Sequence, residues 1–562
     1  MPVGHEDRTD SDKFPAISEL PFTSPAMQIW RRSLATSVSR LGQRSISSKP
    51  SISRCAQILQ ASKTGPCQFE DQEVKINGFV RSVRKQKRFA FAEISDGSTV
   101  EPLQAILKPA QAADLSTGTA VEISGLWKAC PPGKEQTHEL QTTDVTVVGA
   151  SDPEASLRHA PEAMTRKYHS PEFLRQIPHL RIRTPFNSLL SRFRSECMFQ
   201  LGNVFHSHQN GAFTQVQPPL ITSSDCEGAG ETFTLAPRGA ATPSNENEHF
   251  FRAPKYLTVS SQLHLEAYAA ELGNVWTLTP VFRAEKSDTP RHLSEFYMLE
   301  AEVNFMSDLE SLTGLVEHTL RDLTRRLYNT TVGQEILSAK RSGEPGQEAS
   351  AEAGSLRERW TDLMDGPEWH RITYTQAVEQ LQRAVDGGVS FEHSPTWEGG
   401  LQLEHEKYIV EVLYQGRPVF VTDYPKSVKP FYMSPSQTDS SDAPRETVAC
   451  FDLLLPEVSE VAGGSLREHR LPDLIQNMRE HGLIKSRQLS DGTPAPEEPL
   501  YPHLSPDEDL SHLQWYADLR RWGSAPHGGF GLGFDRFLGY LSGVSSVRDI
   551  VSFPRYFGRA DC

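Results

Sequence analysis

Five short strand-like segments follow one another within residues 73–148, and they constrain the fold of this chain more than any other feature. They are rich in β-branched and aromatic residues and read VKINGFVRSV, RFAFAEI, PLQAILK, TAVEISGLWK and DVTVVG. Turn signals such as Asp96-Gly97 separate them. Several short strands within ~80 residues predict a small β-barrel, of which the OB-fold is one candidate. We therefore expect a barrel domain over residues 66–150.

Beyond the barrel the apolar pattern changes to the spacing of a helix. Apolar residues recur every three to four positions until Asn210-Gly211 stops them, and they are Leu190, Phe193, Cys197, Met198, Leu201, Val204 and Phe205. Further on, Ser307 and Glu310 have the spacing of a capping box, which predicts the start of another long helix. Helical and antiparallel-looking strand patterns continue to the C-terminus, so we predict one α+β domain over residues 184–562.

Three internal segments carry no periodic apolar pattern. Residues 151–183 are polar and read as a hinge between the two predicted domains. The stretches near 340–357 and 488–500 are rich in Gly, Ser, Pro and Glu, a composition that buries too little apolar surface to order itself. We predict disordered insertions at both places.

The N-terminal 65 residues read as a disordered extension. No acidic residue occurs between positions 20 and 69, and the part that follows Met27 is rich in Arg and Ser with an apolar helical stripe. That composition is typical of a mitochondrial transit peptide, which predicts the mitochondrial matrix as the location. An ordinary basic tail is the alternative, with a cytoplasmic location, because the segment before Met27 is acidic.

The overall composition excludes several classes of protein. The 562 residues allow about three or four domains. With 57 basic and 72 acidic residues the net charge is −15, so any contact with nucleic acid has to come from local patches. The seven cysteines show no zinc-ligand spacing, and their odd number favours a reducing compartment over a disulfide framework. No apolar run reaches ~18 residues, so we predict no membrane contact.

Residues 282–296 form a charged segment between two strand-like flanks, which predicts a hairpin. Arg283 and Glu285 alternate onto one face of its first strand. A charged pair on an inner sheet face is costly unless it meets a ligand or a partner, so the pair indicates either a ligand site or a buried salt bridge.

Two further segments combine glycines with charge. One starts at His527 and reads HGGFGLGFDRF, so that Asp535 and Arg536 open an apolar helix; this is either a ligand site or a packing device. The other holds Asp452 and Glu460 close together. Carboxylates beside a phosphate site suit Mg²⁺, although such residues also occur in solvated loops.

Taken together, these segments resemble the signature motifs of the class II aminoacyl-tRNA synthetases, in the subgroup for aspartate, asparagine and lysine. Residues 282–302 resemble motif 2, residues 529–536 resemble motif 3, and the long helix with the strand that ends at Pro219 resembles motif 1. The resemblance implies a class II catalytic domain over residues 184–562, built on an antiparallel β-sheet flanked by helices. It also implies a homodimer joined through motif 1. One departure is Asp535, where the family usually has Glu.

The resemblance implies where ATP and Mg²⁺ bind. Arg283 would hold the α-phosphate, and Arg283 with Arg536 would be the catalytic pair. The residues implied to contact ATP are Arg283, Glu285, Arg291, His292, Phe296, Asp452, Glu460 and Arg536. Among them Phe296 and Arg536 would sandwich the adenine ring. Asp452 and Glu460 would carry Mg²⁺.

The amino acid implied is L-asparagine, with asparagine tRNA as the second substrate in protein biosynthesis. Glu227 and Gln262 would receive the α-ammonium. Aspartate enzymes of the subgroup have a Lys where this chain has Leu265, so one cation for a second carboxylate oxygen is missing. Arg467 can donate to the amide oxygen of asparagine, and Glu300 can accept from its NH₂. The alternatives are an aspartate–tRNA ligase, including a non-discriminating one, and a non-catalytic synthetase-like protein.

Basic and aromatic residues interleave at the first hairpin of the barrel, where they are Arg81, Arg84, Lys85, Lys87, Arg88, Phe89 and Phe91. Cationic groups beside aromatic rings suit base stacking. By resemblance this face binds the anticodon through Phe91 and Arg84. The alternative is that one Phe belongs to the barrel core and the charges form a solvated face.

Overall fold

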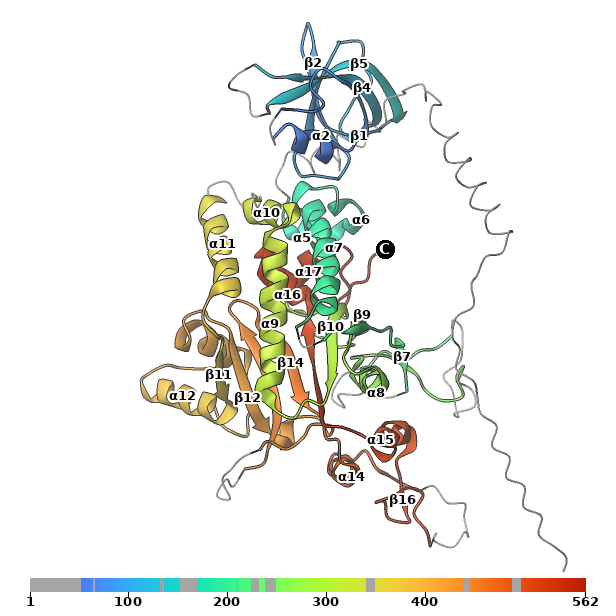
Figure 1. Cartoon of the computed structure of the whole chain (residues 1–562), viewed down its shortest axis with the longest axis vertical. Coiled ribbons are helices and arrows are strands. Elements are labelled where there is room, and N and C mark those ends of the chain that lie inside the picture. The colour runs from blue at the N-terminus through green and yellow to red at the C-terminus, as the bar shows by residue number, and fades with distance from the viewer. Residues whose placement is uncertain are drawn as a thin grey trace, which may run out of the picture.

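The structure, a computed structural model of the chain, describes residues 52–562 except for 64–65, 132, 134–135, 152–168, 210, 224–231, 238–248, 340–348, 438–444 and 488–496 (Figure 1). A small barrel lies at the top of the view, and a larger domain of sheet and helices lies below it. Side chains join the two. Arg81 Nη1 donates to the carbonyl of Arg183 over 3.0 Å, and Thr99 Oγ1 donates to Glu335 Oε1 over 3.1 Å.

The barrel is closed by five strands, β1 (Glu73–Lys85), β2 (Ala90–Ser95), β3 (Leu103–Leu107), β4 (Ala120–Ala129) and β5 (His138–Gly149). Their order is β1-β2-β3-β5-β4, with β3 and β5 parallel and the other neighbours antiparallel. Alternate residues of β4, such as Val121, Ile123 and Trp127, are buried because successive side chains point to opposite faces. This is an OB-fold, and the barrel prediction is confirmed.

Helix α2 (Cys55–Ala61) corrects the prediction that the whole of residues 1–65 is disordered. Its Cys55, Ile58 and Leu59 are buried in the barrel core. Two N–H groups at its start are satisfied by the barrel, since Cys55 N donates to Asp96 and Ala56 N donates to Ser98. The sequence hid this helix because the apolar stripe spans only two turns of a basic, Ser-rich stretch. Residues 1–51 lie outside the described part.

The end of the predicted hinge is helical where the structure describes it, in α5 (Pro171–Gln176) and α6 (Pro178–Arg181). Arg175 pairs with Asp549 at 2.6 Å, and Arg181 donates to the carbonyls of Arg548 and Asp549. These contacts attach the segment to α17 (Val547–Ile550), near the C-terminus.

The large domain is built on an eight-stranded sheet in the order β11-β12-β13-β14-β17-β10-β9-β6. Among the described strands of this sheet, parallel pairing occurs only in the two edge pairs, β11 with β12 and β6 with β9. The strands are β6 (Thr214–Gln215), β9 (Val275–Phe282), β10 (Glu295–Asn304), β11 (His370–Thr373), β12 (Val419–Pro425), β13 (Thr447–Leu455), β14 (Ser459–Leu466) and β17 (His527–Gly533). The prediction of an α+β domain on an antiparallel sheet is confirmed.

Long helices cover one face of this sheet, and Figure 1 shows α7 and α9 running alongside each other. The elements packed into this core are α7 (Pro185–His206), α9 (Leu309–Tyr328), α10 (Thr331–Ser338), α11 (Ala349–Asp365) and α16 (Phe534–Ser542). A second core gathers around α12 (Tyr374–Asp386), the π-helix η2 (Tyr408–Leu413), α14 (Leu471–Glu480) and α15 (Gln514–Arg521). The remaining elements are α8 (Gln262–Leu272), α13 (Leu403–Lys407), η3 (Lys426–Val428), η4 (Ser511–Leu513), β7 (Ile221–Thr222), β8 (Tyr256–Leu257), β15 (Lys485–Ser486) and β16 (Glu508–Asp509).

The helix predictions differ from the structure in two details. Met198, one of the apolar residues at helical spacing, is 37% exposed and stands at the edge of the buried stripe of α7. Helix α9 is capped by Asp308, whose carboxylate accepts from Ser311 N over 2.7 Å, and not by Ser307 with Glu310. Asp is as good an N-cap as Ser, so the adjacent positions could not be separated by residue type alone.

The predicted insertion near 340–357 is wrong in its second half. Helix α11 begins at Ala349, and its Leu356 and Trp360 are buried. The indole N–H of Trp360 donates to the carbonyl of Leu541 over 2.7 Å, which ties the helix to α16. Residues 340–348 and 488–496 lie outside the described part. None of the described helices has the length and apolarity that a bilayer crossing requires.

Candidate active site

Two cavities meet on the sheet face opposite α7 and α9. The first has a volume of about 440 Å³ and the second about 280 Å³. Residues on or next to the central strands line both of them, namely Arg283, Met298, Glu460, Gly463 and Gly531. The period-two alternation of β10 explains the lining, because Leu299 and Ala301 enter the helix-side core while Glu300 and Glu302 face the first cavity.

The glycines of β17 let side chains of β10 lie across that strand. A methyl group on Gly529 would come within 2.0 Å of Glu302 Oε2, and one on Gly531 within 3.1 Å of the Met298 sulfur. Any larger residue at Gly529 would therefore displace a buried carboxylate. The Gly-rich segment is thus part of the first cavity, and its packing and ligand-site interpretations describe the same feature.

The second cavity brings together Arg283, Glu285, Arg291, His292, Phe296 and Arg536, as the motifs predicted. The guanidinium of Arg283 lies over the Phe296 ring, 5.6 Å from its centre. Arg283 and Glu285 differ from expectation in one respect. Strand β9 ends at Phe282, so both residues follow the strand and do not alternate on its face.

The polar groups of the second cavity are anchored largely to backbone carbonyls. Arg291 Nη2 donates to Val458 O over 2.9 Å, and Arg536 Nη1 donates to Glu460 O over 2.8 Å. His292 Nε2 lies 3.4 Å from Glu285 Oε2, and both side chains are 38% exposed. Burial lowers the pKa of His292 although Glu285 opposes the shift, and the positive charges of nearby arginines add to the lowering. The cavity thus presents positive groups, from Arg283, Arg291 and Arg536, to a ligand.

Asp535, which stands where the family usually has Glu, has partners within the protein at the wall of the second cavity. It is buried and forms an ion pair with Arg194 of α7. Its other oxygen accepts from Tyr297 N over 2.9 Å. Both oxygens are therefore used inside the protein.

Asp452 and Glu460 converge over Gly463. A methyl group there would lie 3.2 Å from Asp452 Oδ1 and 3.8 Å from Glu460 Oε1. Lys429 Nζ donates to both oxygens of Asp452, over 2.9 and 3.1 Å. A third carboxylate, Glu406, lies behind them, and burial with the charges of Glu460 and Asp452 raises its pKa to about 7. The excess negative charge and the open space over the glycine fit a divalent cation that keeps some of its waters.

Lys429 and Glu406 were missed as site residues by the sequence reasoning. Lys429 lies 23 positions from its partner Asp452, and Glu406 lies 54 positions from Glu460, whose N–H it accepts. Neither separation is a motif spacing. Only the pairing of β13 with β14 and the approach of the preceding segments bring them together.

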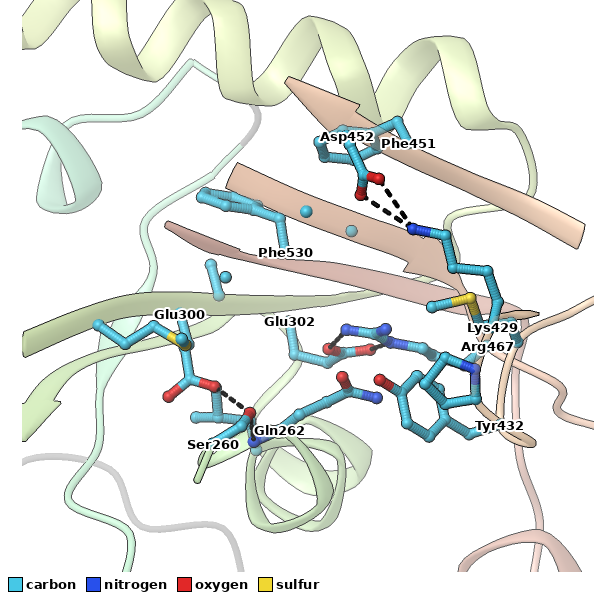
Figure 2. Close-up of a pocket in the computed structure, with 18 of the residues that line it drawn as sticks. Ser260, Gln262, Glu300, Glu302, Lys429, Tyr432, Phe451, Asp452, Arg467 and Phe530 are labelled. Atoms are coloured by element: carbon cyan, nitrogen blue, oxygen red, sulfur yellow. Dashed lines mark hydrogen bonds and ion pairs between the residues drawn. The ribbon is translucent and has the colours of Figure 1, made fainter. Parts of the chain in front are cut away.

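The first cavity is lined by the residues predicted to recognise the side chain of the amino-acid substrate. Glu300 accepts from Ser260 Oγ over 2.5 Å and from Ser261 N over 2.9 and 3.0 Å. In the view of Figure 2, Glu300 lies at the lower left of the cavity and the Asp452–Lys429 pair at the upper right, with Arg467 and the end of Gln262 below that pair. Leu265 also lines this cavity. Glu227, the other predicted ammonium ligand, lies outside the described residues.

Arg467 is paired inside the protein, which the sequence did not predict. Its Nε and Nη2 donate to Glu302 over 3.1 and 3.0 Å, and its Nη1 donates to Ser465 Oγ over 2.7 Å. A guanidinium has more N–H groups than these contacts use, so donors remain for a ligand. Glu302 could have been found from the sequence, because it is two positions from Glu300 and so shares its face of β10.

Behind Arg467, Glu266 and Glu302 form a buried cluster with His527 whose geometry would suit a metal ion. The surrounding charges make a metal unnecessary. Arg520 Nη2 pairs with Glu266 at 2.6 Å, and Arg467 pairs with Glu302, so each carboxylate already has its cation. Burial would raise the pKa of Glu266, but Arg520 and His527 hold it below its usual value.

On the barrel, Phe89 and Phe91 are outside the core, so the alternative that one of them is a core residue is wrong. Ala90 and Ala92 fill the core at this point. The two rings contact edge to face with centres 5.1 Å apart. Arg84 lies opposite Phe91 in the register of β1 and β2. The outer face of this hairpin therefore offers an aromatic pair beside a cation.

A profile of the tRNA synthetases class II (D, K and N) matches residues 170–556, and the chain belongs to this family. Two relatives that are similar over most of their length are asparagine–tRNA ligases. The mitochondrial asparagine–tRNA ligase of Saccharomyces cerevisiae is 38% identical over 498 residues, which cover 86% of this chain and 92% of the relative. The asparaginyl-tRNA synthetase of Homo sapiens is 37% identical, with 86% and 90% covered.

Among solved structures, the chain is similar to the asparaginyl-tRNA synthetase of Pyrococcus horikoshii complexed with asparaginyl-adenylate. The TM-score is 0.69 at 27% sequence identity, and the match covers 90% of this chain and 99% of that one.

Proposed function

We propose that the chain is an enzyme that ligates L-asparagine to asparagine tRNA at the expense of ATP. In the first step a carboxylate oxygen of asparagine attacks the α-phosphorus of ATP, which forms asparaginyl-adenylate and releases pyrophosphate. In the second step a terminal ribose hydroxyl of the tRNA attacks the acyl carbon, and AMP leaves. The observation that carries the proposal is the junction of the two cavities at Arg283, which lines both.

The second cavity is proposed to hold ATP. Phe296 and Arg536 offer an aromatic face and a planar guanidinium to the adenine ring. Arg291 and His292 supply positive or polar groups for the outer phosphates, and Glu285 is available to the adenine edge. Arg283, between the cavities, is proposed to bind the α-phosphate and to offset the negative charge that grows on it during attack.

Asp452 and Glu460 are proposed to hold Mg²⁺. Their convergence over Gly463 supports this assignment, and so does the third carboxylate behind them. Mg²⁺ commonly takes one or two protein carboxylates and completes its shell with water and phosphate oxygens. When bound, it would neutralise phosphate charge beside Arg283.

The first cavity is proposed to select asparagine over aspartate. Glu300 is held as an acceptor by Ser260 and Ser261, so it suits the NH₂ of an amide. Arg467 offers N–H groups to the amide oxygen. Aspartate would place a carboxylate beside Glu300, and Leu265 offers it no second cation. A mispaired buried charge of this kind costs more than about 1–3 kcal/mol.

The assay that tests the function is ATP–pyrophosphate exchange with the full chain, with asparagine and aspartate compared at equal concentration. We expect exchange with asparagine to exceed exchange with aspartate by ~100-fold or more. Charging of an asparagine tRNA transcript tests the second step. Equal exchange with the two amino acids would reassign the chain as an aspartate or non-discriminating enzyme, and no exchange with either would support a non-catalytic role.

We also propose a homodimer formed through α7 and the segment that ends at Pro219. The apolar side chains that α7 exposes support an interface, since Phe199 is 65% and Met198 is 37% exposed. Ile221, just beyond Pro219, is 43% exposed. Light scattering should give twice the chain mass of 62.8 kDa, and an active monomer would contradict the interface.

For the location, we propose the mitochondrial matrix. The Arg- and Ser-rich stretch after Met27 supports import, and relatives include mitochondrial ligases of two yeasts. Fluorescent fusions after Lys63 that start at Met1 or at Met27 should enter mitochondria. Diffuse cytosolic signal from both fusions would favour the cytoplasmic alternative.

A further inference from the structure

Gln262 and Glu266 lie one turn apart at the start of α8, and their side chains are in contact. Gln262 Nε2 lies 3.2 Å from Glu266 Oε1. Gln262 lines the first cavity, whereas Glu266 lies behind it and is only 3% exposed. In Figure 2 the end of the Gln262 side chain extends towards Tyr432 and the Arg467–Glu302 pair.

Glu266 is surrounded by donors. Tyr516 Oη donates to both of its oxygens over 2.9 and 2.8 Å, Arg520 Nη2 donates over 2.6 Å, and His527 Nε2 lies 3.2 Å away. These cationic and polar neighbours keep the carboxylate ionised despite its burial. An ionised carboxylate can only accept hydrogen bonds.

This acceptor fixes which way the amide of Gln262 points. The NH₂ group has to face Glu266, because the amide oxygen would oppose a second acceptor there. The carbonyl oxygen of Gln262 is then the polar atom left for the cavity. A carbonyl oxygen accepts from an ammonium group, whereas an NH₂ in the same place would set donor against donor.

We propose that Glu266 is a positioning residue for amino-acid binding, which locks the Gln262 amide so that its oxygen receives the substrate α-ammonium. The inference rests on the proposed function, since it needs an amino acid in the first cavity. It adds a residue that does not touch the substrate. It also predicts that substitution of this residue impairs recognition of only one substituent of the amino acid, the α-ammonium.

The test compares Glu266→Gln and Glu266→Asp with Tyr516→Phe as the matched control. Glu266→Gln lets residue 266 donate as well as accept, so the orientation of Gln262 is no longer enforced. Glu266→Asp keeps the charge for Arg520 but draws the oxygens away from Gln262, and it serves if the first variant does not fold. Tyr516→Phe removes a different partner of Glu266 and leaves the contact with Gln262 in place.

Three ligands separate recognition of the α-ammonium from general damage. L-asparagine is the substrate in ATP–pyrophosphate exchange, L-asparaginol is an inhibitor that has the ammonium, and succinamate is an inhibitor that lacks it. For both Glu266 variants we expect the KM for asparagine and the Ki for asparaginol to rise about tenfold. The Ki for succinamate and the KM for ATP should stay within twofold, and Tyr516→Phe should leave every constant within twofold.

A Gln262→Met background provides the second measurement. Removal of the amide should itself weaken the binding of asparagine and asparaginol. Addition of Glu266→Gln should then produce no further loss of binding. Equal weakening of asparaginol and succinamate, or full additivity in the double variant, would overturn the positioning role. Failure of the wild-type chain to exchange with asparagine would instead overturn the proposed function, so the two failures are distinguishable.

Discussion

The two cavities are adjacent but are stabilised in different ways. In the second cavity, guanidinium groups are held by backbone carbonyls, and the Glu285–His292 contact is more than a third exposed. In the first cavity, Arg467 and Glu302 form a bidentate pair with side-chain exposures of 3% and 0%. A polyphosphate brings its own charge and needs free cations. Selection of an amide over an acid needs charges whose positions are fixed before the ligand arrives.

A Glu→Gln substitution in each cavity should show most clearly that the two cavities differ in how their charges contribute to stability. Glu302→Gln leaves the Arg467 charge buried without its partner, which should cost about 3–5 kcal/mol of unfolding free energy. Glu285→Gln removes half of an exposed pair and should cost less than about 1 kcal/mol. Denaturant unfolding of the two variants measures the difference. Equal losses of unfolding free energy in the two variants would mean that the charged pairs of the two cavities contribute equally to stability.

Arg283→Ala should remove the guanidinium that lines both cavities without unfolding the protein. Loss of a group that stabilises transition-state charge should lower kcat for adenylate formation by roughly 10²–10³-fold. The melting temperature should change little, because a backbone N–H and not the guanidinium continues the hairpin here. Single-turnover adenylate formation measures the effect, and near-normal kcat in the folded variant would remove Arg283 from the catalytic step.

Ser260→Ala should weaken binding of the amino acid in the first cavity and leave the second cavity unaffected. The variant takes one charge-assisted hydrogen bond from Glu300 and leaves the one from Ser261 N. We expect the KM for asparagine to rise about tenfold, with the KM for ATP unchanged. The preference for asparagine over aspartate should become smaller as well. An effect on ATP binding of equal size would show that the two cavities are not independent.

Phe91→Ala should leave both cavities intact and affect only the tRNA step. Loss of one stacking ring typically costs about 1–3 kcal/mol, so kcat/KM for the tRNA should fall at least about fivefold. ATP–pyrophosphate exchange in the absence of tRNA should be unchanged. The matched control is Phe89→Ala, which removes the neighbouring ring and should have a smaller effect. An equal loss in both variants would contradict the assignment of stacking to Phe91 alone.

The sequence predicted what local patterns determine. Period-two strands predicted the barrel, and three charged segments, by their resemblance to the family motifs, predicted most of the charged residues that line the second cavity. It could not predict partners that only the sheet order brings together. Glu302 meets Arg467 because β17 lies between β10 and β14, and Lys429 meets Asp452 across a long connection. Short elements were missed where their signal spans one or two turns, as in α2, or where adjacent residues cap equally well, as at Asp308.

Helix α2 has a consequence for maturation of the chain. Its Cys55, Ile58 and Leu59 complete the barrel core, and its first N–H groups bond to Asp96 and Ser98. A peptidase that removed the proposed import leader would therefore have to cut before Cys55, because a later cut would take residues out of the barrel core.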